Sequence, residues 1–143
     1  TIAKLLYIFE RFWQEILRFS RRTESQINHW AARYGYKDRG EEILKEAKHG
    51  ANGRYACINL TNTDTIEFRV FRGTLKYNTV IATLRFVANL CRVAISLPEY
   101  RIQEFSWPAL IEALTQDNCP ELVQYLKERN LYVNEPVTAE REV

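Results

Sequence analysis

The hydrophobic period of this sequence changes from about 3.6 residues to two between residues 54 and 71, and then changes back. Two segments, 54–60 (RYACINL) and 65–71 (TIEFRVF), alternate apolar with polar residues, and a short polar loop separates them. Such alternation is typical of strands with one buried face, and the short loop predicts an antiparallel hairpin. Helical patterns on both sides predict an α+β fold, with helices packed on an antiparallel hairpin or sheet.

Before the hairpin, apolar spacing predicts three helices. Residues 2–20 carry a broad apolar stripe, which predicts one long helix. Thr23 and Gln26 fit the capping-box pattern, in which each side chain accepts a hydrogen bond from the other residue's backbone N–H. They predict a second helix that ends near Gly35, and a short third helix is expected over residues 41–48.

After the hairpin, Asn78 or Thr79 is expected to cap a helix that stops before Pro98. Ser106 and Pro120 are expected to begin two further helices. The first of these three helices has apolar residues along one side, which we expect to face the core: Val80, Ile81, Leu84, Val87, Ala88, Cys91 and Ile95.

The 143 residues fit one domain, which we assign to residues 1–133, and the polar segment 134–143 is expected to be a frayed tail. The sequence has no Met and begins with Thr1 inside a helical pattern. We therefore expect a fragment whose missing N-terminal segment supplies further strands, because a lone two-stranded hairpin is only marginally stable.

Composition argues against several classes of protein. Twenty Lys and Arg stand against 18 Asp and Glu, and a net charge of +2 gives no global electrostatic case for binding nucleic acid or a membrane. The three cysteines form neither a disulfide framework nor a zinc motif, which favours reduced thiols and a cytoplasmic location. The apolar stretch 80–97 is interrupted by Arg85, Asn89 and Arg92, so we do not interpret it as a membrane span.

The polar face of the hairpin is the candidate site. Glu67 and Arg69 lie two residues apart on one strand and therefore share a face, and Asn59 joins them if the apolar faces of the two strands match. A carboxylate is a hard oxygen ligand suited to Mg²⁺, and a guanidinium binds phosphate oxygens with two parallel hydrogen bonds. The alternative is a solvated ion pair without function.

The segment 54–75, RYACINLTNTDTIEFRVFRGTL, followed by the capped helix, resembles the C-terminal part of the amidoligase family. That family belongs to the carboxylate–amine ligase superfamily, which has the glutamine synthetase and glutamate–cysteine ligase fold. The upstream segments FERFWQEILRFSRR and NHWAARY resemble its helical section. The resemblance therefore implies the C-terminal part of a glutamine-synthetase-like catalytic fold.

The resemblance also implies roles for individual residues. Glu67 stands in the place of a metal-binding glutamate, and Arg69 stands in the place of a phosphate-binding arginine. Arg54 and Asn59 match positions that contact nucleotide or substrate. The turn that follows matches the family's R-G-T motif with Arg72, Gly73 and Thr74. In that motif the glycine permits close backbone approach, and the threonine orients a ligand.

The implied reaction is an ATP- and Mg²⁺-dependent ligation, in which a substrate carboxylate is phosphorylated and an amine then displaces phosphate to form an amide. The family's other metal-binding strand, which carries an E-x-E type pair near the family's N-terminus, is absent here, and Glu10 and Glu15 on a predicted helix do not have its spacing or setting. We therefore expect the full-length protein to be the enzyme and this fragment alone to be inactive.

Two other functions remain open. The chain could be a non-catalytic interaction module that keeps the ligase fold, or a basic helical protein that binds nucleic acid. Arg18, Arg21 and Arg22, with Arg33 nearby, could contact nucleic acid or an anionic substrate, although cations at the end of a helix also stabilise its dipole. Two further residues are interpreted as structural: His29 packs beside Trp30, and Cys57 is a small buried residue instead of a nucleophile.

Overall fold

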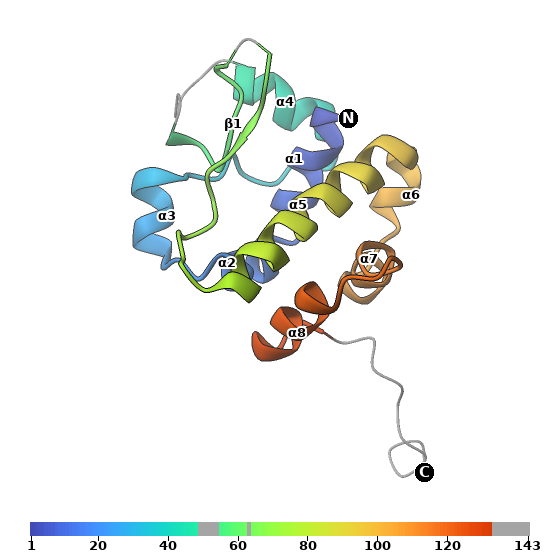
Figure 1. Ribbon diagram of the computed structural model, residues 1–143. Helices are drawn as coiled ribbons and strands as arrows, with labels where there is room; N and C mark the ends of the chain where they lie inside the picture. Colours follow the sequence, from blue (N-terminus) through green and yellow to red (C-terminus); the bar gives the residue numbers. More distant parts are fainter. Residues whose placement is uncertain (49–54, 63, 133–143) are drawn as a thin grey trace, which may run out of the picture.

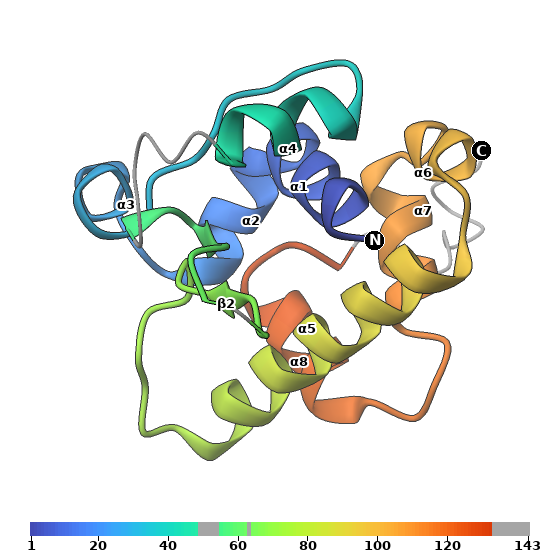
Figure 2. The ribbon, with the colours of Figure 1, turned by 90° about the horizontal axis from the view of Figure 1, so that it is seen from above.

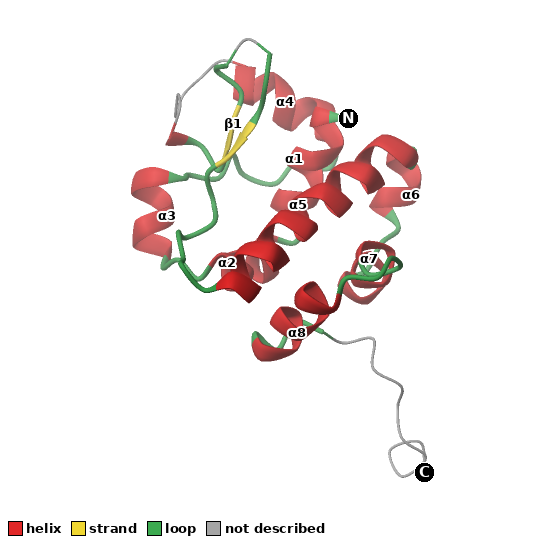
Figure 3. Cartoon of the chain, viewed as in Figure 1, coloured by secondary structure: helices red, strands yellow, loops and turns green. Residues whose placement is uncertain are grey.

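The computed structural model describes residues 1–48, 55–62 and 64–132, and their fold is α+β, as predicted. Figure 3 shows helices surrounding one short antiparallel pair of strands. Their bounds are α1 Ile2–Arg11, α2 Trp13–Ser20, α3 Glu24–Trp30, α4 Gly40–Lys48, β1 Ile58–Asn59, β2 Glu67–Phe68, α5 Tyr77–Ser96, α6 Glu99–Gln103, α7 Trp107–Leu114 and α8 Pro120–Glu128. The expected frayed tail, residues 134–143, lies outside the described residues.

In Figure 1, helix α5 runs across the view between the hairpin and α3 on one side and α7 and α8 on the other, and in Figure 2 the hairpin, α6 and α7 all lie above it. It packs on α8, α1 and α7. The core at its N-terminal half is an aromatic cluster, in which the Phe19 ring stacks on Phe86 at 4.2 Å and meets Tyr125 edge-on at 4.7 Å. The Tyr125 hydroxyl donates to the Phe19 carbonyl, so this cluster fixes the end of α2 against α8.

The predicted caps of α3 and α7 are confirmed, whereas the cap expected from Asn78 or Thr79 is not found at α5. The Thr23 hydroxyl accepts from the Gln26 N–H, and the Gln26 side chain accepts from the Thr23 N–H, which completes the capping box of α3. The Ser106 hydroxyl accepts from the Ala109 N–H at the start of α7. Pro120 lies in the first turn of α8, as expected for a residue without an N–H to satisfy.

The prediction of a single helix over residues 2–20 is wrong, because the chain bends at Phe12 (φ −105°, ψ 34°). The hydrogen bonds from Phe12 N–H to Ile8 and from Ile16 N–H to Phe12 persist, so the bend is local. Phe12 is buried with its ring 5.7 Å from that of Trp107 on α7. This contact with a distant segment is not visible in the helical period of residues 2–20.

The end of α3 was also predicted too late. The helix stops at Trp30 instead of near Gly35, because the next residues pair with the hairpin. The Ala32 N–H donates to the Tyr55 carbonyl at 2.7 Å, and the Cys57 N–H donates to the Ala32 carbonyl at 2.8 Å. A parallel bridge between Ala32 and Ala56 thus borders the hairpin on its second edge.

The hairpin has the expected register but shorter strands. Ile58 lies opposite Phe68, and Asn59 lies opposite Glu67. One more cross-strand bond joins the Arg69 N–H to the Cys57 carbonyl at 2.9 Å. The chain then leaves the hairpin towards α2, where the Arg72 N–H donates to the Ser20 carbonyl, and this departure ends the ladder before Gly73.

The predicted buried side of α5 is also wrong. The structure buries the side with Ala82, Phe86 and Leu90, whereas Leu84 and Ile95 are 62% and 68% exposed. Apolar residues occur on both sides of this helix, so its periodicity cannot decide which side faces the core. The helix begins at Tyr77 without a side-chain cap, and the short α6 after Pro98 was not predicted.

Helix α5 is long and apolar enough to cross a membrane by length and composition. In this structure, however, three polar residues of α5 contact the end of α7 and the residues that follow it. The Asn89 amide donates to the Leu114 carbonyl, the Arg92 guanidinium donates to Ala113, and Arg85 pairs with Asp117 at 3.3 Å. These anchors and its buried side make α5 the central helix of a globular fold. The cytoplasmic location stays a prediction.

Candidate functional site

The hairpin brings three predicted site residues together. Glu67 Oε1 accepts from Asn59 Nδ2 at 3.2 Å and from Arg69 Nη1 at 3.1 Å. Asn59 is buried, and its Oδ1 accepts from the backbone N–H and the hydroxyl of Thr61, which fixes the amide. The Glu67 side chain is 47% exposed. The carboxylate is therefore held in one orientation by the protein and open to solvent.

The Arg69 guanidinium is held from three directions. Besides the bond to Glu67, its Nε donates to the Trp30 carbonyl at 3.4 Å, and its centre lies 5.6 Å from the Tyr55 ring. Trp30 meets both Tyr55 and His29 edge-on, and the contact with His29 confirms the predicted packing of that residue. This small aromatic platform places a 28%-exposed cation beside the open carboxylate.

The other predicted site residues lie elsewhere. Thr74 accepts from the Lys76 N–H through its hydroxyl and lines a hollow of about 510 Å³ between the 72–74 turn and α5. A Cβ built at Gly73 would have no heavy atom within 4 Å, so nothing in this fold requires glycine there. Arg72 is exposed and faces α2. Arg54 lies outside the described residues.

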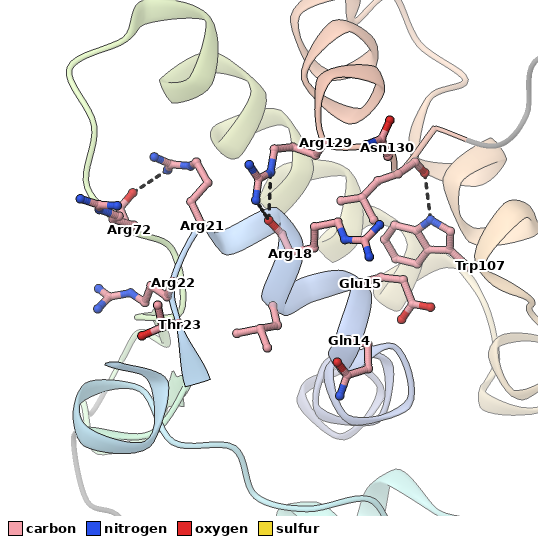
Figure 4. Close-up of a pocket in the computed structure, with 12 residues that line it drawn as sticks. Gln14, Glu15, Arg18, Arg21, Arg22, Thr23, Arg72, Trp107, Arg129 and Asn130 are labelled. Atoms are coloured by element: carbon pink, nitrogen blue, oxygen red, sulfur yellow. Dashed lines mark hydrogen bonds between the residues drawn. The ribbon is translucent and has the colours of Figure 1, made fainter. Parts of the chain in front are cut away.

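A second polar feature is a cleft of about 800 Å³ beside the end of α2, where the sequence left an anion contact open for Arg18, Arg21 and Arg22. Five arginines line it, from three separate segments, and we call it the arginine cleft: Arg18, Arg21, Arg22, Arg72 and Arg129. Figure 4 shows Arg22 and Arg72 at one side and Arg18 and Arg129 nearer Trp107. Glu67 and Arg69 are not in its lining, so the cleft and the hairpin face are adjacent but separate.

Backbone carbonyls organise the arginine cleft. Arg129 donates through Nε and Nη2 to the Arg18 carbonyl at 3.2 and 2.9 Å, which ties the end of α8 to α2. Arg21 donates to the Arg72 carbonyl at 2.6 Å and to the Tyr125 hydroxyl at 3.0 Å. Within the described ranges, none of the five arginines forms an ion pair with an acidic side chain.

Arg22 connects the two features. Burial, followed by the positive charges of Arg69 and Arg72, lowers the pKa of the Arg22 guanidinium. Its Nε is buried and has no hydrogen-bond partner among the residues described, and its Nη2 reaches only the Phe71 carbonyl at 3.4 Å. Three like charges therefore lie close together between the hairpin face and the arginine cleft.

Arg33 does not belong with the other arginines, contrary to the sequence prediction. Its guanidinium lies over the Trp13 ring and donates through Nε to Glu10 Oε2 at 2.7 Å, with Nη2 at 2.6 Å from the same oxygen. The Tyr34 N–H donates to the other carboxylate oxygen. The bridge of Ala32 to the hairpin places Arg33 beside α1, and no local pattern in residues 23–35 indicates that contact.

Cys57 is a structural residue, as predicted. Its side chain is fully buried, and burial and the Glu10 charge raise the pKa of the thiol to about 12. A thiol with this pKa is protonated at neutral pH and is a poor nucleophile. Over the part of the chain that the structure describes, no three acidic, His or Cys side chains gather as a metal site.

Comparison with protein-family models, with curated proteins and with solved structures finds no match for this chain. Its function is therefore argued from the sequence pattern and the geometry of the site.

Proposed function

We propose that this chain is the C-terminal part of an ATP-dependent carboxylate–amine ligase with a glutamine-synthetase-like catalytic fold. The observation that carries the proposal is the arrangement on the hairpin. A half-exposed carboxylate and a guanidinium share one oxygen contact at 3.1 Å, and a buried amide orients the carboxylate. The resemblance of residues 54–75 to the amidoligase family assigns the same two residues to metal and phosphate.

The arginines around Arg69 provide more positive charge than a surface ion pair requires, and this excess suits a site for a phosphoryl group. Glu67 neutralises one cation, Arg69, but Arg22 lies nearby, and burial followed by the charges of Arg69 and Arg72 lowers the pKa of the Arg22 guanidinium. An isolated ion pair on a solvated strand requires no further cations. A site for a transferring phosphoryl group does, because its negative charge is spread over three oxygens.

The donor set is compatible with Mg²⁺. This ion is commonly held by one or two protein carboxylates together with substrate phosphates, and Glu67 would provide one such oxygen ligand. When bound, Mg²⁺ would neutralise charge on the phosphates of ATP.

In the proposed reaction the terminal phosphoryl group of ATP passes to the substrate carboxylate, and an amine then displaces phosphate to form an amide. Arg69 would bind phosphoryl oxygens, and Arg72 would add positive charge from the adjoining turn. Asn59 would hold the Glu67 carboxylate and contact the nucleotide, as the resemblance implies for Arg54 as well. Thr74 would orient a ligand beside α5. The second acidic strand would come from outside residues 1–143, so this chain alone is expected to be inactive.

The test is phosphate release from ATP by the full-length protein, in the presence of Mg²⁺ and mixtures of carboxylates and amines. Glu67→Gln and Arg69→Gln should lower the rate by about 100-fold or more, because each removes charge stabilisation at the reacting group. Arg101→Gln, an exposed arginine on α6, is the matched control for loss of one positive charge. Unchanged rates in both site variants, with the fold retained, would contradict the assigned roles.

One observation favours the alternative of a non-catalytic interaction module. The outer side of α5 exposes apolar residues, including Leu84 and Ile95, and exposed apolar patches mark contact surfaces on many proteins. A full-length protein that lacks any second acidic strand and releases no phosphate would support this alternative.

A further inference from the structure

The arginine cleft has a composition that the fold itself does not explain. Five guanidiniums line one concave surface with a single carboxylate, that of Glu15. A helix C-terminus favours cations, which accounts for Arg18 in the last turn of α2. It does not account for Arg72, which comes from the loop after β2. Arg129, which follows α8, is held by the Arg18 carbonyl and brings a further positive charge to the same surface. Positive charges from three segments of the chain therefore lie in one cleft, although their mutual repulsion disfavours this arrangement.

The backbone at the rim of the cleft supports a specific role for one of these arginines. Arg21 adopts a left-handed conformation (φ 63°, ψ 17°), which glycine or asparagine would adopt at lower cost. Its side chain then bonds to the Tyr125 hydroxyl and the Arg72 carbonyl, so it is directed along the cleft wall. The chain keeps an arginine at a position where its backbone is strained, and the side chain is therefore the feature to be explained.

We propose that the arginine cleft binds a small polyanion, a molecule with two or more phosphate or carboxylate groups. The cations stand in two groups, Arg22 and Arg72 at one side and Arg18 and Arg129 at the other, so one ligand can be held at two points (Figure 4). A guanidinium binds either type of oxyanion through paired hydrogen bonds. The volume of about 800 Å³ is in the range of small-molecule sites.

The concave shape favours a small ligand over nucleic acid. Proteins that bind nucleic acid without an enclosed site present a basic stripe that follows the backbone, whereas these arginines line one cleft that Trp107 also borders. The net charge of the chain is only +2, so the positive potential is local to the cleft.

The proposal does not depend on the ligase function, because Arg18 and Arg129 lie outside the hairpin face. The experiment is calorimetric titration of the chain with two probes, tripolyphosphate and citrate, at fixed ionic strength. The two probes distinguish phosphate from carboxylate as the preferred oxyanion, and binding of either one supports the proposal. A single-stranded RNA of ten nucleotides serves as the third probe.

Arg18→Gln should weaken binding of the preferred probe by roughly tenfold or more, since it removes a charge-assisted contact. The Arg18 guanidinium is exposed, and this change leaves the carbonyl that holds Arg129 in place. Arg18→Lys keeps the positive charge but loses the paired donors, so its affinity for the preferred probe should lie between those of the native chain and Arg18→Gln. Arg101→Gln is the matched control, and Arg69→Gln reports on the hairpin face.

The outcomes separate clearly. Weaker binding in Arg18→Gln, with Arg101→Gln close to the native chain, supports the proposal. Loss of binding in Arg69→Gln alone would place the anion at the hairpin and overturn it. Equal weakening in Arg18→Gln and Arg101→Gln would indicate non-specific attraction, and tighter binding of the RNA than of either small probe would indicate a nucleic-acid surface. Both results would contradict the proposal, as would the absence of any binding.

Discussion

Two arginine–carboxylate pairs in this protein share the same chemistry and differ in their surroundings. In the Arg33–Glu10 pair, the Glu10 side chain is 1% exposed, and its oxygens accept bonds from the Arg33 guanidinium and the Tyr34 N–H. In the Arg69–Glu67 pair, the Glu67 side chain is 47% exposed. The first carboxylate has no room for a ligand, while the second is held in place and still open. Burial therefore separates a structural pair from a candidate binding pair.

The strongest test of this difference is removal of the buried carboxylate. Glu10→Ala should lower the free energy of unfolding by about 3 kcal/mol or more, because Arg33 and the Tyr34 N–H lose their acceptor in a partly desolvated site. Urea unfolding at pH 7 measures the change. Glu112→Ala, at an exposed position of α7, is the matched control and should change stability by no more than about 0.5 kcal/mol. Similar losses in the two variants would remove the distinction.

A smaller loss of folding stability is expected in alkaline solution, because the Glu10 carboxylate of the buried pair lies near the thiol of Cys57. Burial, then the charge of Glu10, raises the pKa of Cys57 to about 12 from its ordinary value of 9.0. The unfolded chain therefore loses this proton first, and stability should fall as pH rises from about 9 towards 12. The loss from Cys57 should be about 1 kcal/mol at pH 10.

Cys57→Ala should make the decline in stability between pH 8 and pH 10 shallower, as measured by urea unfolding in a reducing buffer. Cys91→Ala is the control, because Cys91 is only half-buried. An equally steep decline in Cys57→Ala would mean that the thiol does not contribute. Tyr34 remains in both variants, and burial, with the Cys57 and Glu10 charges, raises the pKa of its hydroxyl to about 12.

The smallest effect is expected at the exposed pair. Glu67→Ala, Arg69→Ala and the double variant form a cycle whose coupling energy should be about 0.5 kcal/mol in urea unfolding at pH 7. The long distance of 3.1 Å and the solvent access of both groups limit its strength. A coupling above about 2 kcal/mol would indicate a structural pair like that of Glu10, and would weaken the proposed role in catalysis.

Several features encoded within a few residues were predicted correctly, although the expected cap of α5 at Asn78 or Thr79 was not. The capping box of Thr23 and Gln26 and the cap at Ser106 depend on side chains three positions apart, so their geometry follows from the local sequence. The hairpin register also followed from alternation, because a slip by one residue would have exposed Ile58 and Phe68. That register is what brought Asn59, Glu67 and Arg69 together.

Features set by distant segments were missed. The contact of Phe12 with Trp107 and the bridge from Ala32 to Ala56 each changed where a helix ends. Burial of α5 depended on which of two apolar sides met α8. The arginine cleft needed Arg129, more than 100 residues from Arg18 in sequence, to donate to the Arg18 carbonyl. No periodic pattern in one segment carries this information.

The positions of two tryptophans have an optical consequence. Trp30 lies beside the hairpin: its carbonyl accepts from Arg69, and its indole ring meets the Tyr55 ring edge-on. Trp107 lines the arginine cleft, and its indole N–H donates to the Leu131 carbonyl. Each of the two polar features thus has its own intrinsic fluorophore. With Trp13 and one of the other two replaced by phenylalanine, the emission of the remaining indole reports on one feature at a time. The molecule carries two separate spectroscopic probes without any added label.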